Sequence, residues 1–109
     1  MTLLKINELE PGVNVESVKG KIIEISEPRI VNTRYGKRSV ADVKLEDETG
    51  TIKLSLWEQN IDLVYVGDLV SITGAYVTVY RDEIQLNISR SGTIEVVNRG
   101  SNEQDILGI

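Results

Sequence analysis

The sequence predicts an all-β domain in the form of a small five-stranded barrel, and three observations lead to this prediction. Short runs rich in Val, Ile, Thr and Leu are separated by turn sequences. The alternation of apolar residues slips within two of these runs, as it does where barrel strands bend. One connection between runs is too long for a hairpin. The length of 109 residues fits one compact domain.

Turn sequences set the expected strand boundaries. They stand at "EPG" (10–12), "YGK" (35–37), "DETG" (47–50), "VGD" (66–68), "RD" (81–82) and "SG" (91–92). The runs between them predict strands at residues 13–26, 39–46, 51–57, 68–80 and 83–89. Ahead of the first strand, "LLKINELEPG" predicts a short turn or a lead-in strand that ends at Pro11 and Gly12.

Two strands show the slipped alternation. In the fourth, Val70 and Ile72 share one parity, while Val77 and Val79 share the other, with "TGA" between them. We therefore expect a bulge or kink at Gly74. The first strand slips in the same way, because apolar positions 18 and 22 give way to positions 23 and 25.

The third and fourth strands are joined by "EQNIDLVYV", whose apolar residues Ile61, Val64 and Tyr65 favour a short helical turn. Five strands with a helical connection between the third and fourth is the order of the OB-fold barrel. A β-sandwich would need about seven strands. We expect residues 1–97 to form one OB-fold domain and residues 98–109 a short, flexible tail.

The composition argues against catalysis. The chain has neither Cys nor His, so it offers no disulfide framework, zinc site, or Cys–His or Ser–His pair. The carboxylates of "EDETG" suit a hairpin turn better than a metal site. Nothing resembles a signal peptide or a membrane span. The sequence therefore predicts a non-enzymatic protein without cofactor, located in the cytoplasm.

The charge is unevenly distributed. The formal net charge is −5, but Lys19 to Arg38 holds six cations and two anions, a local charge of +4 that leaves −9 elsewhere. Charge alone favours the interpretation that these cations only keep an edge strand and its loop soluble, without binding a ligand. The aromatic residues change that balance.

Strand alternation predicts that the aromatic rings point outward. If Val77 and Val79 face the core, then Tyr76 and Tyr80 face away from it. The same rule places Trp57 outside, together with Lys53 and Ser55 on the third strand and Gln85, Asn87 and Ser89 on the fifth. The rings could close the barrel mouth or cover strand edges. Three large rings at exposed strand positions nevertheless favour a binding role.

Rings beside cations suit single-stranded nucleic acid. Each base has a π-face, and stacking contributes about 1 to 3 kcal/mol per base without demanding a particular sequence. Lysine and arginine follow the phosphates of the same strand. This combination predicts a single-stranded nucleic acid as the ligand.

Two segments carry a family resemblance, "SEPRIVNTRYGKRSVADVKLEDETGTIKLSLWEQN" and "VGDLVSITGAYVTVYRDEIQLN". They resemble the simple single-OB single-stranded DNA-binding proteins of archaea and, less closely, their eukaryotic relatives and the DNA-binding domains of replication protein A. The similarity runs from Ile6 to about Val97. It implies a protein that coats and protects single-stranded DNA during replication, recombination and repair.

The resemblance also implies the binding residues. Trp57, Tyr76 and Tyr80 match rings that stack on bases in that family, and basic residues of the first strand and the following loop match phosphate contacts. The eukaryotic relatives carry a further aromatic where Asn87 stands, and many archaeal members have a long polar tail that is nearly absent here. The expected nucleic-acid-binding set is Trp57, Tyr76, Tyr80, Lys21, Arg29, Val31, Arg34, Lys37, Arg38, Lys53, Arg81 and Asn87.

Two other functions fit the same pattern. The domain could bind RNA or tRNA, since nothing in the sequence visibly reads a 2′-hydroxyl. It could also bind a protein and use its rings as interface anchors. The expected partners are single-stranded DNA or RNA and replication or repair proteins, and the free protein is expected to be a monomer.

Overall fold

The computed structural model describes residues 3–99, which form an all-β structure with two short 3-10 helices. The helices are η1 (Ile6–Glu8) and η2 (Glu58–Leu63). The strands are β1 (Leu3–Leu4), β2 (Asn14–Ile25), β3 (Arg29–Thr33), β4 (Gly36–Asp47), β5 (Gly50–Trp57), β6 (Leu69–Tyr80) and β7 (Glu83–Asn98).

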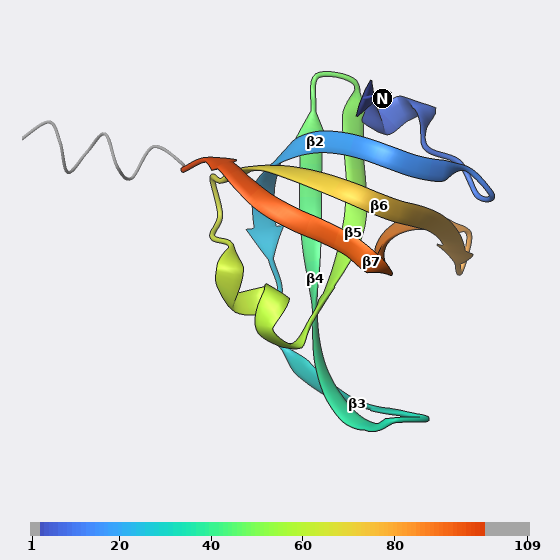
Figure 1. Ribbon diagram of the computed structural model, residues 1–109, viewed down its shortest axis with the longest axis vertical. Helices are drawn as coiled ribbons and strands as arrows, with labels where there is room; N and C mark the ends of the chain where they lie inside the picture. Colours follow the sequence, from blue (N-terminus) through green and yellow to red (C-terminus); the bar gives the residue numbers. More distant parts are fainter. Residues whose placement is uncertain (1–2, 100–109) are drawn as a thin grey trace, which may run out of the picture.

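Five of the strands close into a barrel (Figure 1). β2 pairs antiparallel with both β4 and β6, β4 pairs with β5, and β6 pairs with β7. A short parallel pairing of β5 with β7, from Lys53–Gln85 to Ser55–Asn87, completes the ring. The prediction of an all-β OB-fold barrel is therefore confirmed, with these five strands in the predicted order.

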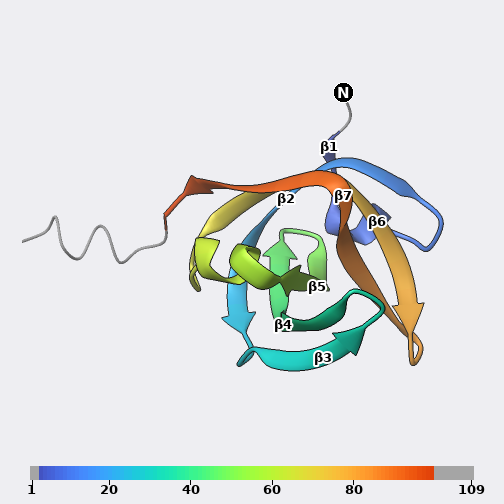
Figure 2. The ribbon, with the colours of Figure 1, turned by 60° about the horizontal axis from the view of Figure 1, so that its bottom comes forward.

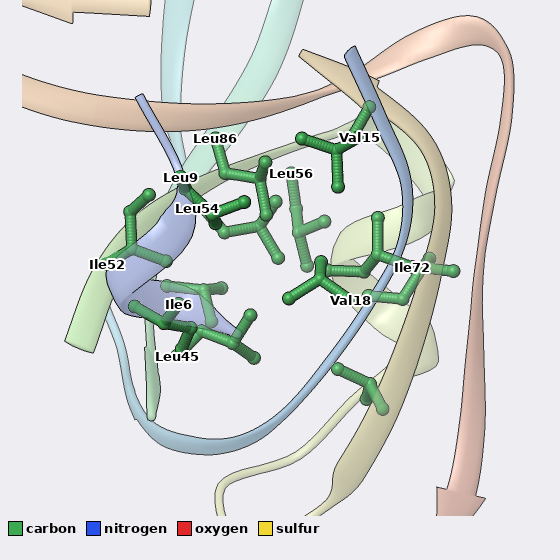
Figure 3. Packing of buried hydrophobic residues seen from close by; sticks show 14 of the residues in the cluster. Ile6, Leu9, Val15, Val18, Leu45, Ile52, Leu54, Leu56, Ile72 and Leu86 are labelled. Carbon is green, nitrogen blue, oxygen red and sulfur yellow. The ribbon is translucent and has the colours of Figure 1, made fainter. Parts of the chain in front are cut away.

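Inward-facing aliphatic side chains from all five barrel strands fill the interior (Figure 3). Leu45, Leu54 and Leu86 are among the side chains with no measurable exposure to solvent. Each fully buried aliphatic side chain of this size contributes about 1.5 to 3 kcal/mol. The strand alternation that buries them turns the intervening residues of β4, β5 and β7 outward.

Both predicted slips in alternation are present as bulges. The β6–β7 register shifts between Thr73 and Ala75, and Gly74 has φ +70°, a left-handed conformation that favours glycine. The β2–β4 register shifts between Ile22 and Glu24. The bulges bend these strands around the barrel.

The turn predicted at Ser91–Gly92 is wrong, because β7 continues through it to Asn98. Gly92 lies where β7 crosses the bulge of β6. A Cβ atom there would come within 2.2 Å of the Gly74 carbonyl oxygen and 2.6 Å of that of Thr73. Glycine serves here to let two backbones approach closely, rather than to reverse the chain.

One strand, β3, was not predicted. β3 lies in the segment interpreted as a loop and pairs with β4 from Arg29–Val40 to Thr33–Gly36, forming a hairpin that projects beyond the barrel. Its residues are mostly exposed, so they show no apolar alternation. β1 is a two-residue strand parallel to β2, which agrees with the predicted lead-in strand.

The connection after β5 is helical, as predicted, but it is the 3-10 helix η2 and holds no α-helical turn. Val64 beyond it is buried, whereas Tyr65 is exposed. Val79, predicted to face the core, is also exposed. It has the expected parity, but the β6–β7 hairpin has already left the barrel at that point.

The N-terminal segment is fastened to the β4–β5 turn. Asp47 accepts hydrogen bonds from the Ile6 amide at 2.8 Å and the Thr49 amide at 2.7 Å, and Lys5 forms an ion pair with Glu48. Partial burial raises the pKa of Asp47, but the hydrogen bonds from Thr49, Ile6 and Gly50 outweigh burial and hold that pKa below its usual value.

At the other end, Arg99 follows β7 and pairs with a buried carboxylate. Its Nη1 lies 2.7 Å from Oδ2 of Asp68, which also accepts a hydrogen bond from the Tyr65 amide at 2.9 Å. This contact lies beyond the domain boundary expected at residue 97. Residues 100–109, most of the expected tail, lie outside the described residues. Within residues 3–99, no helix has the length and apolar character needed to cross a membrane.

Candidate nucleic-acid interface

Two hairpins extend beyond the barrel on either side of an open sheet surface (Figure 2). We call the β3–β4 hairpin, residues 29–40, the first arm, and the β6–β7 hairpin, residues 76–87, the second arm. The surface between them, the central face, is the outer side of β4, β5 and the start of β7. Paired residues in a sheet project on the same side, so the register identifies the side chains on this face.

One register row runs across the central face. Tyr76 pairs with Asn87, Asn87 with Ser55, and Ser55 with Asp42. Tyr76 is 44% exposed, whereas Ser55 is buried and accepts a hydrogen bond from Nε2 of Gln85 at 2.7 Å. The Tyr76 ring therefore stands beside a floor of small polar groups.

The next row brings Lys53 onto the same face. Thr78 pairs with Gln85, and Gln85 pairs with Lys53. Nδ2 of Asn87 donates a hydrogen bond to Thr78 Oγ1 at 3.0 Å, which fixes its amide along the strands. A base stacked on a neighbouring ring would meet hydrogen-bonding groups on this floor.

Trp57 lies at the end of β5, where the first arm begins. It pairs with Val40, which pairs in turn with Arg29. Val40 is buried, whereas Trp57, its partner on the next strand, is 39% exposed. Glu58, directly after the tryptophan, has φ +52°, so the chain leaves the strand through an uncommon left-handed residue.

The first arm adds Val31 and Arg38 to this side. They pair with each other, and they share the parity of Arg29 and Val40. Val31 is partly buried, and Arg38 Nη1 lies 4.0 Å from Oε1 of Glu58, beside the tryptophan. The structure therefore brings Arg29, Val31 and Arg38 to the same side as Trp57.

Three expected cations stand apart from this group. Lys37 pairs with Asn32 on the opposite side of the first arm, and Arg34 lies in its turn. Lys21 pairs with Glu46, six positions along β4 from the partner of Trp57, or about 20 Å at a rise of about 3.3 Å per residue. These three residues lie at the edge of any path that a bound ligand could take between the arms.

The tip of the second arm holds Tyr80 and Arg81. The Tyr80 ring is 60% exposed, and Cζ of Arg81 lies 5.2 Å from its centre. Arg81 and Asp82 form the two-residue turn with φ values of +52° and +65°. The turn presents a ring and a guanidinium together.

Carboxylates that the sequence reasoning did not include accompany the cations of this surface. Arg29 pairs with Asp42 at 3.1 Å and Lys53 with Glu83 at 3.4 Å. The Lys53 pair lines a hollow of about 320 Å³ beside the central face. The Lys53–Glu83 pair is exposed and contributes little to stability, whereas the Asp42 side chain is 28% exposed and holds Arg29 through one oxygen; a phosphate can compete for both cations.

One exposed ring was also missed. Tyr35, in the turn of the first arm, is 67% exposed, and Cζ of Arg38 lies 6.0 Å from its ring centre. The available sign of a binding role was its position next to Arg34 in a basic turn. Turn residues are commonly exposed, so exposure there does not indicate binding. Strand alternation does not extend through a turn, so it gave no direction for this side chain.

Residues 9–96 match the model of a protein family described as "Single-stranded DNA binding protein Ssb-like, OB fold". The single-stranded DNA-binding protein Ssb of Saccharolobus solfataricus is 32% identical over 83 residues, which are 76% of this chain and 56% of that protein. Replication factor A of Methanothermobacter thermautotrophicus is 31% identical over 99 residues, which are 90% of this chain and 12% of that protein. The chain thus spans about half of the first relative and a small part of the second.

Solved structures show the same fold. An OB domain from Thermoplasma acidophilum has a TM-score of 0.76 at 29% identity, covering 88% of this chain and 87% of that one. The second OB-fold domain of replication protein A from Methanococcus maripaludis has a TM-score of 0.74 at 21% identity, covering 91% and 98%. With most of its length matched by the family model, the chain belongs to the Ssb-like family of OB-fold single-stranded DNA-binding proteins.

Proposed function

We propose that this chain binds single-stranded DNA along the central face, with bases stacked on Trp57, Tyr76 and Tyr80. The observation that carries the proposal is the exposure of three rings on the same side of the sheet, Trp57 at the base of the first arm and Tyr76 and Tyr80 on the second, with cations on both arms. Exposed rings in a basic groove bind single strands with little sequence preference. Family membership supports this ligand.

The remaining binding residues have distinct tasks in this proposal. Arg29, Arg38 and Lys53 exchange their carboxylate partners for phosphates, while Val31 and Asn87 contact bases from the first arm and the floor. Arg81 contacts the strand where it leaves the second arm. Lys21, Arg34 and Lys37 provide peripheral attraction to phosphates, since Lys37 lies on the opposite side of the first arm, Arg34 in its turn, and Lys21 six positions along β4 from the strand partner of Trp57.

In the cell, this binding would coat and protect strands exposed during replication, recombination and repair. The protein would act on the nucleoid without catalysing a reaction, as a monomer in its free state. Proteins of replication or repair would be its partners. Every residue assigned to the proposed interface lies within the OB-fold domain expected at residues 1–97.

Titration with oligo(dT) tests the proposal directly. Trp57 is the only tryptophan, so stacking on a base should quench its fluorescence. Trp57→Ala, Tyr76→Ala and Tyr80→Ala should each weaken binding by about 1 to 3 kcal/mol, or about 5-fold to 150-fold. The tryptophan-free variant requires a labelled oligonucleotide and fluorescence anisotropy.

Stability and ligand type provide the controls. Each variant should melt close to the parent temperature, because rings that act only in folding would lower affinity by unfolding the site. A matched RNA oligonucleotide should compete less well than DNA. Parent-like binding by all three variants would refute the stacking mechanism. If the parent protein binds no oligonucleotide at low salt, single-stranded DNA is not its ligand.

Salt dependence tests the phosphate contacts. With roughly 2 to 5 contacts and a slope of about 0.7 per contact, log K should fall with log salt at about 1.4 to 3.5. Replacing Arg29 and Arg38 with Ala should lower this slope. A slope near zero in the parent would remove the cations of the first arm from the mechanism.

A further inference from the structure

Tyr35 offers a binding surface that the three-ring site does not include. It lies in the turn of the first arm, and 67% of the residue surface is exposed. The turn is held by Thr33, whose Oγ1 accepts a hydrogen bond from the Tyr35 amide at 3.1 Å and donates one to the Gly36 carbonyl at 2.8 Å. The ring therefore projects from a well-defined turn.

The contacts of Arg38 show which way this ring faces. Arg38 shares the side of the first arm that carries Val31 and Val40, the strand neighbour of Trp57. Its Cζ lies 6.0 Å from the Tyr35 ring centre, and its Nη1 lies 4.0 Å from Oε1 of Glu58, the residue after Trp57. The guanidinium thus bridges the Tyr35 ring and the end of β5, which places the ring on the Trp57 side.

The two arms present the same chemistry at their tips. Arg38 lies over Tyr35 on the first arm, as Arg81 lies over Tyr80 on the second, at 5.2 Å. Each pair offers a π-face for a base and a guanidinium for the adjacent phosphate. Without a ligand, the cation–π contact contributes only about 0.5 to 1 kcal/mol at an exposed site, so the stability of the fold depends little on this ring.

We propose that Tyr35 is a fourth base-stacking ring, which binds the nucleotide beyond the one on Trp57 and extends the bound strand to the tip of the first arm. This proposal rests on the proposed function. It gives the strand a path from the tip of the second arm, across Tyr76 and Trp57, to the tip of the first.

The test is a length series of oligo(dT), from about 4 to about 16 nucleotides, the range of site sizes for OB folds. Tyr35→Ala should weaken binding of the longest oligonucleotide by about 5-fold or more and leave that of the shortest almost unchanged. Tyr35→Phe retains the ring and should bind like the parent at every length. Tyr35→Leu retains apolar bulk without a π-face and should behave like the alanine variant.

Tyr65 supplies a matched control. It is 62% exposed with Cζ of Arg99 5.4 Å from its ring centre, but it precedes β6 at the end of that strand remote from Tyr76 and Tyr80. Tyr65→Ala should bind every oligonucleotide like the parent. Melting temperatures of all variants, measured alongside, should show that removing either ring leaves the fold intact.

The outcomes separate the two proposals. If Trp57→Ala loses affinity while Tyr35→Ala binds all lengths like the parent, the fourth ring is refuted and the proposed function stands. If Tyr35→Ala and Tyr65→Ala weaken long oligonucleotides equally, the effect belongs to exposed tyrosines in general and the assignment of Tyr35 fails. If the parent binds no oligonucleotide, the proposed function fails together with the inference.

Discussion

Removing the Arg99 side chain should destabilise the barrel although it lies at the edge of the described chain. Arg99 Nη1 is 2.7 Å from Oδ2 of Asp68, and the aspartate side chain is only 2% exposed. A hydrogen bond to a charged group contributes about 1.5 to 3 kcal/mol, and breaking a fully buried pair costs about 3 to 5 kcal/mol. Because the arginine side chain is 45% exposed, the lower range applies.

We therefore expect Arg99→Ala to lower the free energy of unfolding by about 2 kcal/mol. For a domain of this size each kcal/mol corresponds to about 4 to 8 °C, so the melting temperature should fall by about 8 to 16 °C. The assay is thermal and urea denaturation of the full chain, followed by circular dichroism. Arg99→Lys should recover part of the loss, since it keeps the charge but not the fork of donors.

Two controls make this test specific. Arg90→Ala removes the same charge from an exposed position of β7 that forms no ion pair within residues 3–99, and it should change stability by less than about 0.5 kcal/mol. A double-mutant cycle with Asp68→Asn should give a coupling free energy above about 1 kcal/mol. Equal stability of the Arg99→Ala and Arg90→Ala variants would refute the assigned role of the ion pair.

Three further predictions concern the arms and the N-terminal contact. Replacing Arg81 and Asp82 by Asn-Gly, the pair favoured where both turn residues have positive φ, should stabilise the fold by about 1 kcal/mol in urea denaturation yet weaken oligonucleotide binding. Asp42→Asn releases Arg29 from its 3.1 Å ion pair and should raise DNA affinity about 2-fold to 5-fold by anisotropy; unchanged affinity would exclude Arg29 from phosphate binding. Because the folded-state pKa of Asp47 is lowered, its contribution to stability is complete above its ordinary pKa and is lost as pH falls through the folded value. The Asp47→Asn variant should therefore melt below the parent at pH 7 and close to it at about pH 2.

Regular alternation made the barrel strands predictable, and the prediction failed where the alternation stops. The outward parity of Tyr76 and the bulge at Gly74 both followed from positions 70 to 79 of one strand. β3 could not be found in this way, because neither side of a projecting hairpin is buried continuously. Gly92 was misread for another reason, since the contact that requires it comes from β6, about twenty positions earlier in the chain.

The site was predictable in its rings but not in its ion pairs. Trp57 and Tyr80 were expected to be exposed from local parity, and they are. The pairing of Arg29 with Asp42 depends on how β3 packs beside β4, and the side on which Lys37 lies depends on the register of the same hairpin. Both features depend on how strands are placed beside one another, and the positions of charges along the sequence do not show that placement.

The crossing at Gly74 and Gly92 holds the base of the second arm on the barrel, and it leaves the tip of that arm as a part that can be exchanged. The strands touch there through their backbones, with 2.2 Å between a would-be Cβ of Gly92 and the Gly74 oxygen, so β7 cannot take a side chain at position 92 without being pushed away from β6. Beyond the crossing, Ala75 pairs with Ile88 and residues 85–87 still pair with β5, so the hairpin leaves the barrel only past Val77 and Leu86. A hairpin tip of another length, or with another ring in place of Tyr80, can therefore be grafted between Thr78 and Gln85 while the β5–β7 pairing keeps the barrel closed.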